Sequence, residues 1–185
     1  MIEIVPYRQD WPALFLQVAG KLKEISGDDL PGIHHIGSTA VPGMAAKDII
    51  DVQVSVREFD SGIEAGLLAK GFSQFFYTDH CPAGATLAPA ELDKRFFALT
   101  DPAVHLHIRQ IGRFNQRYAL LCRDFLRNNT AAAIAYQTVK YELAKRFAYD
   151  PQGYYDIKDP VFDLLMAGAE IWAKQQGWNP SASDV

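Results

Sequence analysis

A glycine–serine pair and an aspartate that follows it are the residues of this chain best suited to bind phosphate and metal. Gly37 and Ser38 follow a short apolar segment, and Asp51 lies on the polar side of a strand pattern. A pair of small residues lets the backbone approach a phosphate closely, and Mg²⁺ prefers carboxylate oxygens. Phosphoryl and nucleotidyl transfer need such a cation to neutralise charge on the phosphates. The spacing therefore predicts a phosphate-and-metal site.

The sequence departs from a two-magnesium site close to Asp51. Two acids at positions i and i+2 of a strand point to the same face and bracket a magnesium ion efficiently. The residue two positions after Asp51 is Gln53, an amide that carries no charge. The sequence therefore indicates a binding site more strongly than it indicates catalysis.

Histidines form a second set of candidate metal ligands. His105 and His107 alternate with apolar residues in a predicted strand, so both imidazoles lie on one face. Imidazole suits zinc, manganese or nickel. A mixed site of His35, Asp51 and His107, with His105 beside it, is one hypothesis. The alternative is an exposed polar strand face that binds no metal.

Basic side chains could complete a phosphate site. Lys47 and Arg109 are expected to add charge-assisted contacts to phosphate. Lys94 and Arg95 adjoin the histidine-bearing strand and could do the same. Arg123 has the pattern of a solvated helix face.

The elements that position these residues combine strands and helices. Apolar patterning predicts strands at residues 2–5, 33–36, 48–56, 72–77, 94–99 and 104–109. Apolar residues at three- and four-residue steps predict helices from residue 11, over residues 59–70, and repeatedly after residue 112. Gly27 is the expected end of the first helix. Residues 78–90 are rich in Pro, Gly, Ala and Thr, which predicts a loop long enough to act as a lid.

The longest motif is HIGSTAVPGMAAK, residues 35–47, followed by residues 49–51, 105–107, 123–127 and the region of residues 154–158. On these residues the chain resembles the GrpB-like family, which is placed within the nucleotidyltransferase-fold superfamily. The resemblance covers nearly the whole chain. It implies an α+β fold, with a small nucleotidyltransferase-like mixed β-sheet, flanking helices and a helical C-terminal half.

The superfamily pattern also implies roles for single residues. It assigns Gly37 and Ser38 to the phosphates of a nucleotide, and Asp51 to the metal and to catalysis. The second acid of the pattern falls at Gln53, and the third acid has no counterpart within residues 106–109. The loss of two carboxylates weakens a two-magnesium mechanism.

Three functions are compatible with these residues. The first is a metal-dependent nucleotidyltransferase that moves a nucleoside monophosphate from an NTP co-substrate to an unknown small-molecule or protein acceptor. Its cofactor would be a divalent cation, magnesium before manganese or zinc. The second is a catalytically degenerate nucleotide- or metabolite-binding protein on the same fold. The third is a metal-dependent phosphohydrolase or lyase centred on His35, His105 and His107.

Size, charge and cysteine content limit the remaining possibilities. A chain of 185 residues fits one domain, expected over residues 1–178 with an α/β core at 1–112 and C-terminal helices at 113–178. The polar residues 179–185 are expected to be disordered. A net charge of −4 argues against a broad nucleic-acid or anionic-membrane surface. Two distant cysteines, the lack of a signal-peptide pattern and the lack of a long apolar run predict a cytoplasmic protein without a membrane span. The sequence leaves the oligomeric state open.

Overall fold

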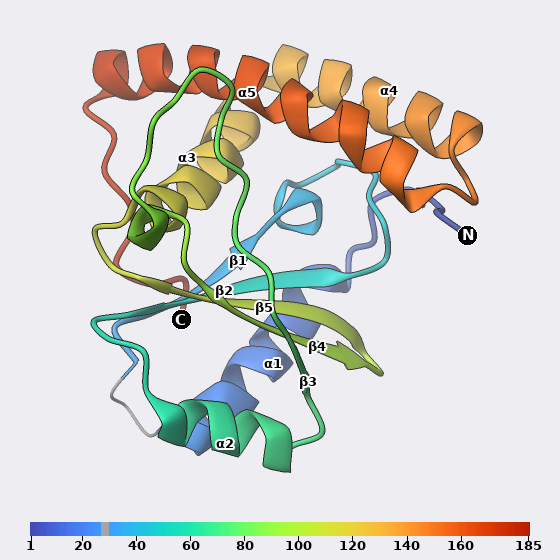
Figure 1. Cartoon of the computed structure of the whole chain (residues 1–185). Helices are drawn as coiled ribbons and strands as arrows, with labels where there is room; N and C mark the ends of the chain where they lie inside the picture. Colours follow the sequence, from blue (N-terminus) through green and yellow to red (C-terminus); the bar gives the residue numbers. More distant parts are fainter. Residues whose placement is uncertain (27–29) are drawn as a thin grey trace.

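Five strands form one mixed sheet in the computed structural model, which describes residues 1–26 and 30–185 (Figure 1). The strands are β1 (Gly32–Ile36), β2 (Ile50–Val56), β3 (Ser73–Phe75), β4 (Arg95–Thr100) and β5 (Ala103–Gln110). Their order across the sheet is β1-β2-β5-β4-β3. The β2–β5 pair is parallel and the other pairs are antiparallel. β1 and β3 are therefore the edge strands.

Helices cover both faces of this sheet (Figure 1). The helices are α1 (Trp11–Ser26), α2 (Ser61–Ala69), α3 (Phe114–Asn128), α4 (Thr130–Arg146) and α5 (Pro151–Gln176), and two short 3₁₀ segments are η2 (Ser38–Ala40) and η3 (Pro89–Glu91). α1 and α2 lie on one face, and α3, α4 and α5 form a layer on the other (Figure 1). The arrangement confirms the predicted α+β class, with a mixed sheet, flanking helices and a helical C-terminal half.

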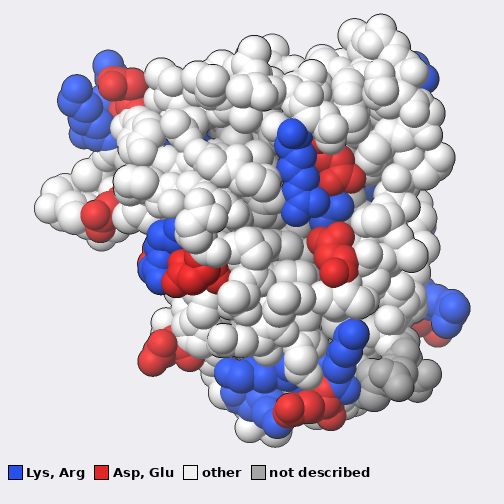
Figure 2. Space-filling view, turned by 180° about the vertical axis from the view of Figure 1, so that it is seen from behind, with Lys and Arg blue, Asp and Glu red and all other residues white. Residues whose placement is uncertain are grey.

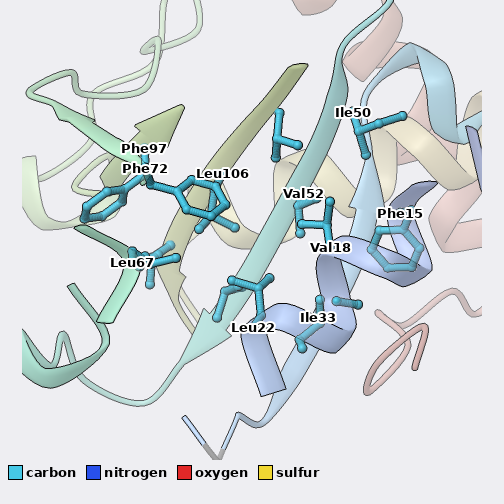
Figure 3. Close-up of a cluster of buried hydrophobic side chains, with 14 of the residues drawn as sticks. Phe15, Val18, Leu22, Ile33, Ile50, Val52, Leu67, Phe72, Phe97 and Leu106 are labelled. Atoms are coloured by element: carbon cyan, nitrogen blue, oxygen red, sulfur yellow. The ribbon is translucent and has the colours of Figure 1, made fainter. Parts of the chain in front are cut away.

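The apolar side of the sheet packs against α1 and α2. Figure 3 shows Phe15, Val18 and Leu22 of α1 beside Ile33 and Val52 of the sheet, all of them buried. The same cluster continues toward α2 through Leu67, Phe72, Phe97 and Leu106 (Figure 3). Full burial of one such side chain contributes roughly 1.5–3 kcal/mol. A shift of β2 by one residue would exchange its buried and polar sides, so this cluster specifies the register of the sheet.

The other side of the two central strands carries a row of polar side chains. Across the parallel pair, the opposed residues are Asp51 and His105, Gln53 and His107, and Ser55 and Arg109. Opposed residues of neighbouring strands point to the same face. Gln53 donates a hydrogen bond to the backbone of α3, so this polar face is turned toward the C-terminal helices.

Two predicted elements differ from the observed ones. Residues 2–5 make one bridge, from Val5 to Ala46, instead of a strand. The strand expected over residues 72–77 is limited to β3. Gly27, the expected helix end, lies outside the described residues.

The C-terminal residues differ from the disordered tail that their composition predicts. They lie along β1, where Ser183 Oγ accepts a hydrogen bond from Ile33 N at 3.0 Å and Asp184 N donates to Ile33 O at 3.0 Å. The carboxylate of Asp184 also accepts from His35 N at 2.9 Å and from Arg123 Nη1 at 2.6 Å. Because an edge strand presents unpaired backbone groups, polar residues can be ordered there without apolar packing. Arg123, predicted to be solvated, is buried by the same contacts.

The surface carries charges of both signs. On the face shown in Figure 2, most basic side chains lie beside acidic ones in small groups, with wide uncharged areas between them. Among the described residues, no helix has the length and apolar character that a membrane crossing requires.

Candidate functional site

A cavity of about 750 Å³ lies between the polar face of the sheet and the C-terminal helices. Its lining comes from the turn after β1, from β2, β4 and β5, and from α3, α4 and α5, and it includes Gly37, Asp51, His107 and Lys140. Small-molecule sites are clefts of about 300–1,000 Å³. The cavity is therefore large enough for a ligand the size of a nucleotide.

Gly37 brings the backbone directly against the carboxylate of Asp51. Its φ of 71° and ψ of −169° fall in a region that is essentially open only to glycine. A Cβ atom at this position would lie 2.4 Å from Asp51 Oδ2. Ser38 follows at once and begins η2. The turn and the acid, which the sequence predicted to act together, therefore meet at one wall of the cavity.

Two imidazoles of β5 face Asp51. His105 Nδ1 lies 3.4 Å from Asp51 Oδ1, and His107 Nε2 lies 3.9 Å from the same oxygen. Burial alone would raise the pKa of the Asp51 carboxyl, but interaction with the two imidazoles outweighs burial and holds this pKa below its usual value. Burial and the nearby Arg109 guanidinium lower the pKa of His107 to about 4. Near neutral pH the site thus presents an ionised carboxylate and a neutral imidazole of His107.

His35 lies on the opposite face of the sheet, so its predicted grouping with Asp51 and His107 is wrong. It is opposed to Val52, an apolar core residue. Its ring stacks on Phe15 of α1 with the centroids 4.9 Å apart, and its Nε2 lies 3.0 Å from Thr39 Oγ1. The antiparallel register places Ile36, not His35, opposite Asp51. The hydrolase hypothesis centred on three histidines fails for the same reason.

The buried His35 is expected to make stability depend on pH. Burial lowers its pKa to about 4 from an ordinary value of 6.5, so below the ordinary value the unfolded chain binds a proton that the folded chain does not. The free energy of unfolding should therefore fall as the pH drops from about 6.5 toward 4, by at most about 3 kcal/mol for this residue. Urea unfolding at several pH values measures the loss. A His35→Gln variant should lose less over the same range, and an unchanged pH profile in this variant would contradict the assignment.

Arg109, predicted to contact phosphate, is held by partners within the protein. Its Nε and Nη2 donate to the carboxylate of Asp79 at 2.7 and 2.9 Å, and its Nη1 donates to Gln53 Oε1 at 2.7 Å. The Asp79 carboxylate also accepts from Lys94 Nζ at 2.6 Å and from Asn115 Nδ2 at 3.0 Å. Arg109 and Lys94 are thus paired with Asp79 while both line the cavity, and their contact with phosphate stays a prediction.

Arg95, the other basic residue suggested beside the histidine-bearing strand, does not line the cavity, unlike Lys94 and Arg109. Its guanidinium lies 4.1 Å from the centroid of the Phe59 ring, and its Nε lies 3.2 Å from Glu64 Oε1. Glu64 belongs to α2, so Arg95 points to the face of the sheet opposite Asp51. It therefore contributes no charge to the candidate site.

The segment between β3 and β4 connects the sheet with α5. Figure 1 shows it rising from the edge of the sheet to the helical layer and returning. Asp79 anchors it to β5, while His80 Nε2 lies 3.2 Å from Asp163 of α5 and Ala83 N donates to the same carboxylate at 3.1 Å. Residues 78–80 line the cavity, so the loop predicted as a lid forms part of its wall.

The residues present do not fit a two-magnesium centre. Asp51 is the one carboxylate of the expected pair, because Gln53 occupies the second position. The Gln53 amide is also engaged within the protein: its Oε1 accepts from Arg109, and its Nε2 donates to Gln116 O at 3.1 Å. The Asp79 carboxylate is occupied by cationic and amide donors. In the described ranges, no group of three or more His, Cys, Asp or Glu side chains is arranged to hold a metal ion.

Lysines of the helical layer reach the cavity although the sequence did not single them out as site residues. Lys140 of α4 and Lys158 of α5 line it together with Lys47, whose Nζ donates to Tyr155 Oη at 2.6 Å. A lysine within a helix has the same local pattern whether it faces solvent or a cavity. The family resemblance includes the region of residues 154–158, and this was the signal in the sequence that could have pointed to Lys158.

Comparison with known proteins gives matches over most of the chain. A UPF0157 protein of Halalkalibacterium halodurans is 31% identical over 171 residues, which cover 91% of this chain and 82% of that protein. A dephospho-CoA kinase of Mycolicibacterium paratuberculosis is 32% identical over 200 residues, which cover 97% of this chain and 48% of the kinase. The chain thus spans about half the length of the kinase that it matches.

A solved structure shows the same fold. The crystal structure of the conserved protein GrpB from Enterococcus faecalis has a TM-score of 0.75 and 26% sequence identity, and the match covers 92% of this chain and 99% of that one. Residues 1–167 match the family described as GrpB protein. This match includes the Gly37–Ser38 turn, Asp51 and the histidine-bearing strand, and by it the chain belongs to the GrpB family.

Proposed function

We propose that the cavity binds a nucleotide together with one divalent cation, so that the chain acts first as a nucleotide-binding protein. The observation that carries this proposal is the contact of Gly37 with Asp51, since it puts an ionised carboxylate directly against a backbone turn. A phosphate that approached this turn would lie next to the carboxylate. A cation between the two would balance both negative charges.

A single cation is compatible with the donors at this wall. Magnesium is usually bound through one or two carboxylates, with phosphate oxygens and water completing its shell, and Asp51 would be the carboxylate here. The imidazoles of His105 and His107 would favour manganese or zinc if they joined the shell. Gly37 and Ser38 would contact the phosphates. We place magnesium before manganese and zinc, with an NTP as the nucleotide.

Nucleotidyl transfer from the NTP to a small-molecule or protein acceptor is the second candidate function. It is favoured by the ionised state of Asp51 beside the Gly37–Ser38 turn. The neutral Gln53, tied to Arg109, opposes it because the second carboxylate of a two-metal mechanism is missing. Mycobacterial relatives carry the name dephospho-CoA kinase, but this chain covers 48% of the kinase described above, so both candidates rest on the site alone.

Asp51→Asn is expected to abolish metal-dependent nucleotide binding while the chain stays folded. The amide keeps the shape of the side chain but loses the charge that would hold the cation. A thermal-shift screen of NTPs with Mg²⁺, Mn²⁺ and Zn²⁺ measures this, since a ligand at about 100 times its Kd stabilises by about 2.7 kcal/mol. Asp156→Asn, at an exposed position of α5, is the matched control. An equal metal-dependent shift in wild type and Asp51→Asn would refute the assignment of Asp51.

The same proteins separate binding from transfer. Pyrophosphate released during incubation with NTP and metal, and lost in Asp51→Asn, would support nucleotidyl transfer. A metal-dependent shift without pyrophosphate release would leave binding as the function.

A further inference from the structure

We propose that Lys47, Lys140 and Lys158 form a second, metal-independent subsite in the cavity, which binds an oxyanion and above all a phosphate group. The subsite deepens the proposed function, because it would hold a phosphate away from the cation at Asp51. It lies where α4 and α5 meet the segment that follows the Gly37–Ser38 turn. The argument rests on the positions and partners of the three ammonium groups.

Lys140 is the most deeply placed of the three. Its residue is 2% exposed, and its Nζ donates to the backbone oxygen of Ala45 at 2.6 Å. The Tyr136 ring lies 4.9 Å from the ammonium. Both neighbours are uncharged, and burial of an ammonium without an opposite charge is costly. An anion in the cavity would remove that cost.

Lys47 and Lys158 bring two more cations to the same cavity. Lys47 Nζ is bonded to Tyr155 Oη and lies 4.9 Å from the centre of that ring. Lys158 Nζ lies 4.3 Å from the Phe162 ring and 3.6 Å from Asp159 Oδ1. Aromatic rings attract a cation weakly through their faces, and they leave its positive charge uncompensated.

The balance of charge around the cluster is positive. The carboxylates that act on Lys140 and Lys158 are Asp51 and Asp159, and Lys47 adds a third cation to the same cavity. Asp159 is 41% exposed on its side chain, which lets water screen its contribution. An oxyanion would balance the remaining positive charge.

Tyr136 links the lysine cluster to the Gly37–Ser38 turn. Its ring lies against Lys140, and its hydroxyl, near Ser38, is buried without a hydrogen bond of normal geometry among the described residues. A buried hydroxyl without a partner is uncommon in folded proteins. An oxyanion between Ser38 and Lys140 would accept this hydrogen bond.

The titration of Lys140 gives the subsite a signature that a merely structural lysine would lack. Burial and repulsion by Lys158 and Lys47 lower its pKa to about 7, with Asp51 and Cys122 acting in the opposite direction. The free cavity therefore loses positive charge as the pH rises through neutrality. Anion affinity should fall over the same interval.

The first test uses tripolyphosphate with EDTA, so that no divalent cation takes part, and calorimetry on the whole chain. Lys140→Gln and Lys158→Gln are each expected to weaken binding about tenfold or more, because each removes a charge-assisted hydrogen bond. Lys145→Gln, on the exposed side of α4, is the matched control and should bind as wild type does. Glutamine at position 140 can still donate to Ala45 O, so the fold is expected to survive, and circular dichroism checks it.

The second test follows sulfate binding from about pH 6 to about pH 9, because sulfate keeps its charge over this range. Wild-type affinity should fall by about tenfold as Lys140 loses its proton. Lys140→Gln should show a flatter profile. Failure of wild type to bind tripolyphosphate, equal affinities in wild type and both lysine variants, or the same pH profile with and without Lys140 would overturn the subsite.

Competition identifies the source of the phosphate. Displacement of tripolyphosphate by NTP with Mg²⁺ would assign the subsite to the tail of the nucleotide, and simultaneous binding would assign it to a separate phosphorylated ligand. Asp51→Asn distinguishes the two proposals at about pH 6, where Lys140 keeps its proton: the subsite requires that metal-free tripolyphosphate binds this variant at least as tightly as wild type, since a nearby negative charge has been removed. The test can thus refute nucleotide binding at Asp51 and support the lysine subsite, or refute the subsite and support nucleotide binding.

Discussion

Replacement of Arg109 by methionine is expected to lower the free energy of unfolding by about 3 kcal/mol, because it removes one partner of a buried ion pair and leaves Lys94 as the remaining cation on Asp79. The Asp79 carboxylate would lose its bidentate contact, and Gln53 Oε1 would lose its donor. The Arg109 and Asp79 side chains are 7% and 16% exposed, so little water can take over these contacts. Urea unfolding at about pH 7 measures the loss.

A matched arginine on the surface provides the control. Arg146 pairs with Glu142 one turn away on α4, and both side chains are well exposed. Such a pair contributes about 0.3–0.5 kcal/mol, so Arg146→Met should be nearly neutral. If Arg109→Met were as mild as Arg146→Met, the buried network would not stabilise the fold.

Gly37→Ala is expected to abolish metal-dependent nucleotide binding and to cost about 1–3 kcal/mol of stability. The backbone conformation at position 37 strains any side chain, and the added Cβ would lie 2.4 Å from Asp51 Oδ2. The carboxylate must then move away from the turn where the phosphate and cation would meet. Thermal shift with NTP and Mg²⁺ measures binding, and urea unfolding measures stability.

Gly43→Ala separates backbone strain from the steric clash. Gly43 also has a positive φ, of 79°, but nothing lies within 4 Å of a Cβ built there. This variant should show the strain alone and retain nucleotide binding. If Gly37→Ala bound as Gly43→Ala does, the close approach of turn and carboxylate would have no part in the site.

The sequence by itself determined which residues share a face of each strand. Period-two alternation places Asp51 and Gln53 on the polar side of β2, and His105 and His107 on that of β5, as the register shows. This pattern is local, because successive side chains of a strand point to opposite sides. The family match over residues 1–167 includes both strands.

The tertiary structure decided which of these faces meet. His35 stands next to Ile36 in the chain, but the register of β1 with β2 turns its ring into the apolar core. Asp79 reaches Arg109 from a loop 30 residues away in sequence, and no periodicity marks a loop residue for such a contact. Local sequence patterns predict which residues share one face of a helix or strand. Which residues that face then contacts depends on packing between distant segments of the chain.

Lys140 and Lys158 illustrate the same limit on the helices. Each has the sequence environment of a solvated lysine, and only the packing of α4 and α5 over the sheet turns both toward the cavity. Gln53 is the intermediate case. Its loss of charge is readable in the sequence, but its bond to Arg109 depends on the pairing of β2 with β5. The residue types therefore determined which chemistry is available to this chain. Strand register and helix packing decided where the site lies, because they bring together side chains that no local sequence pattern relates.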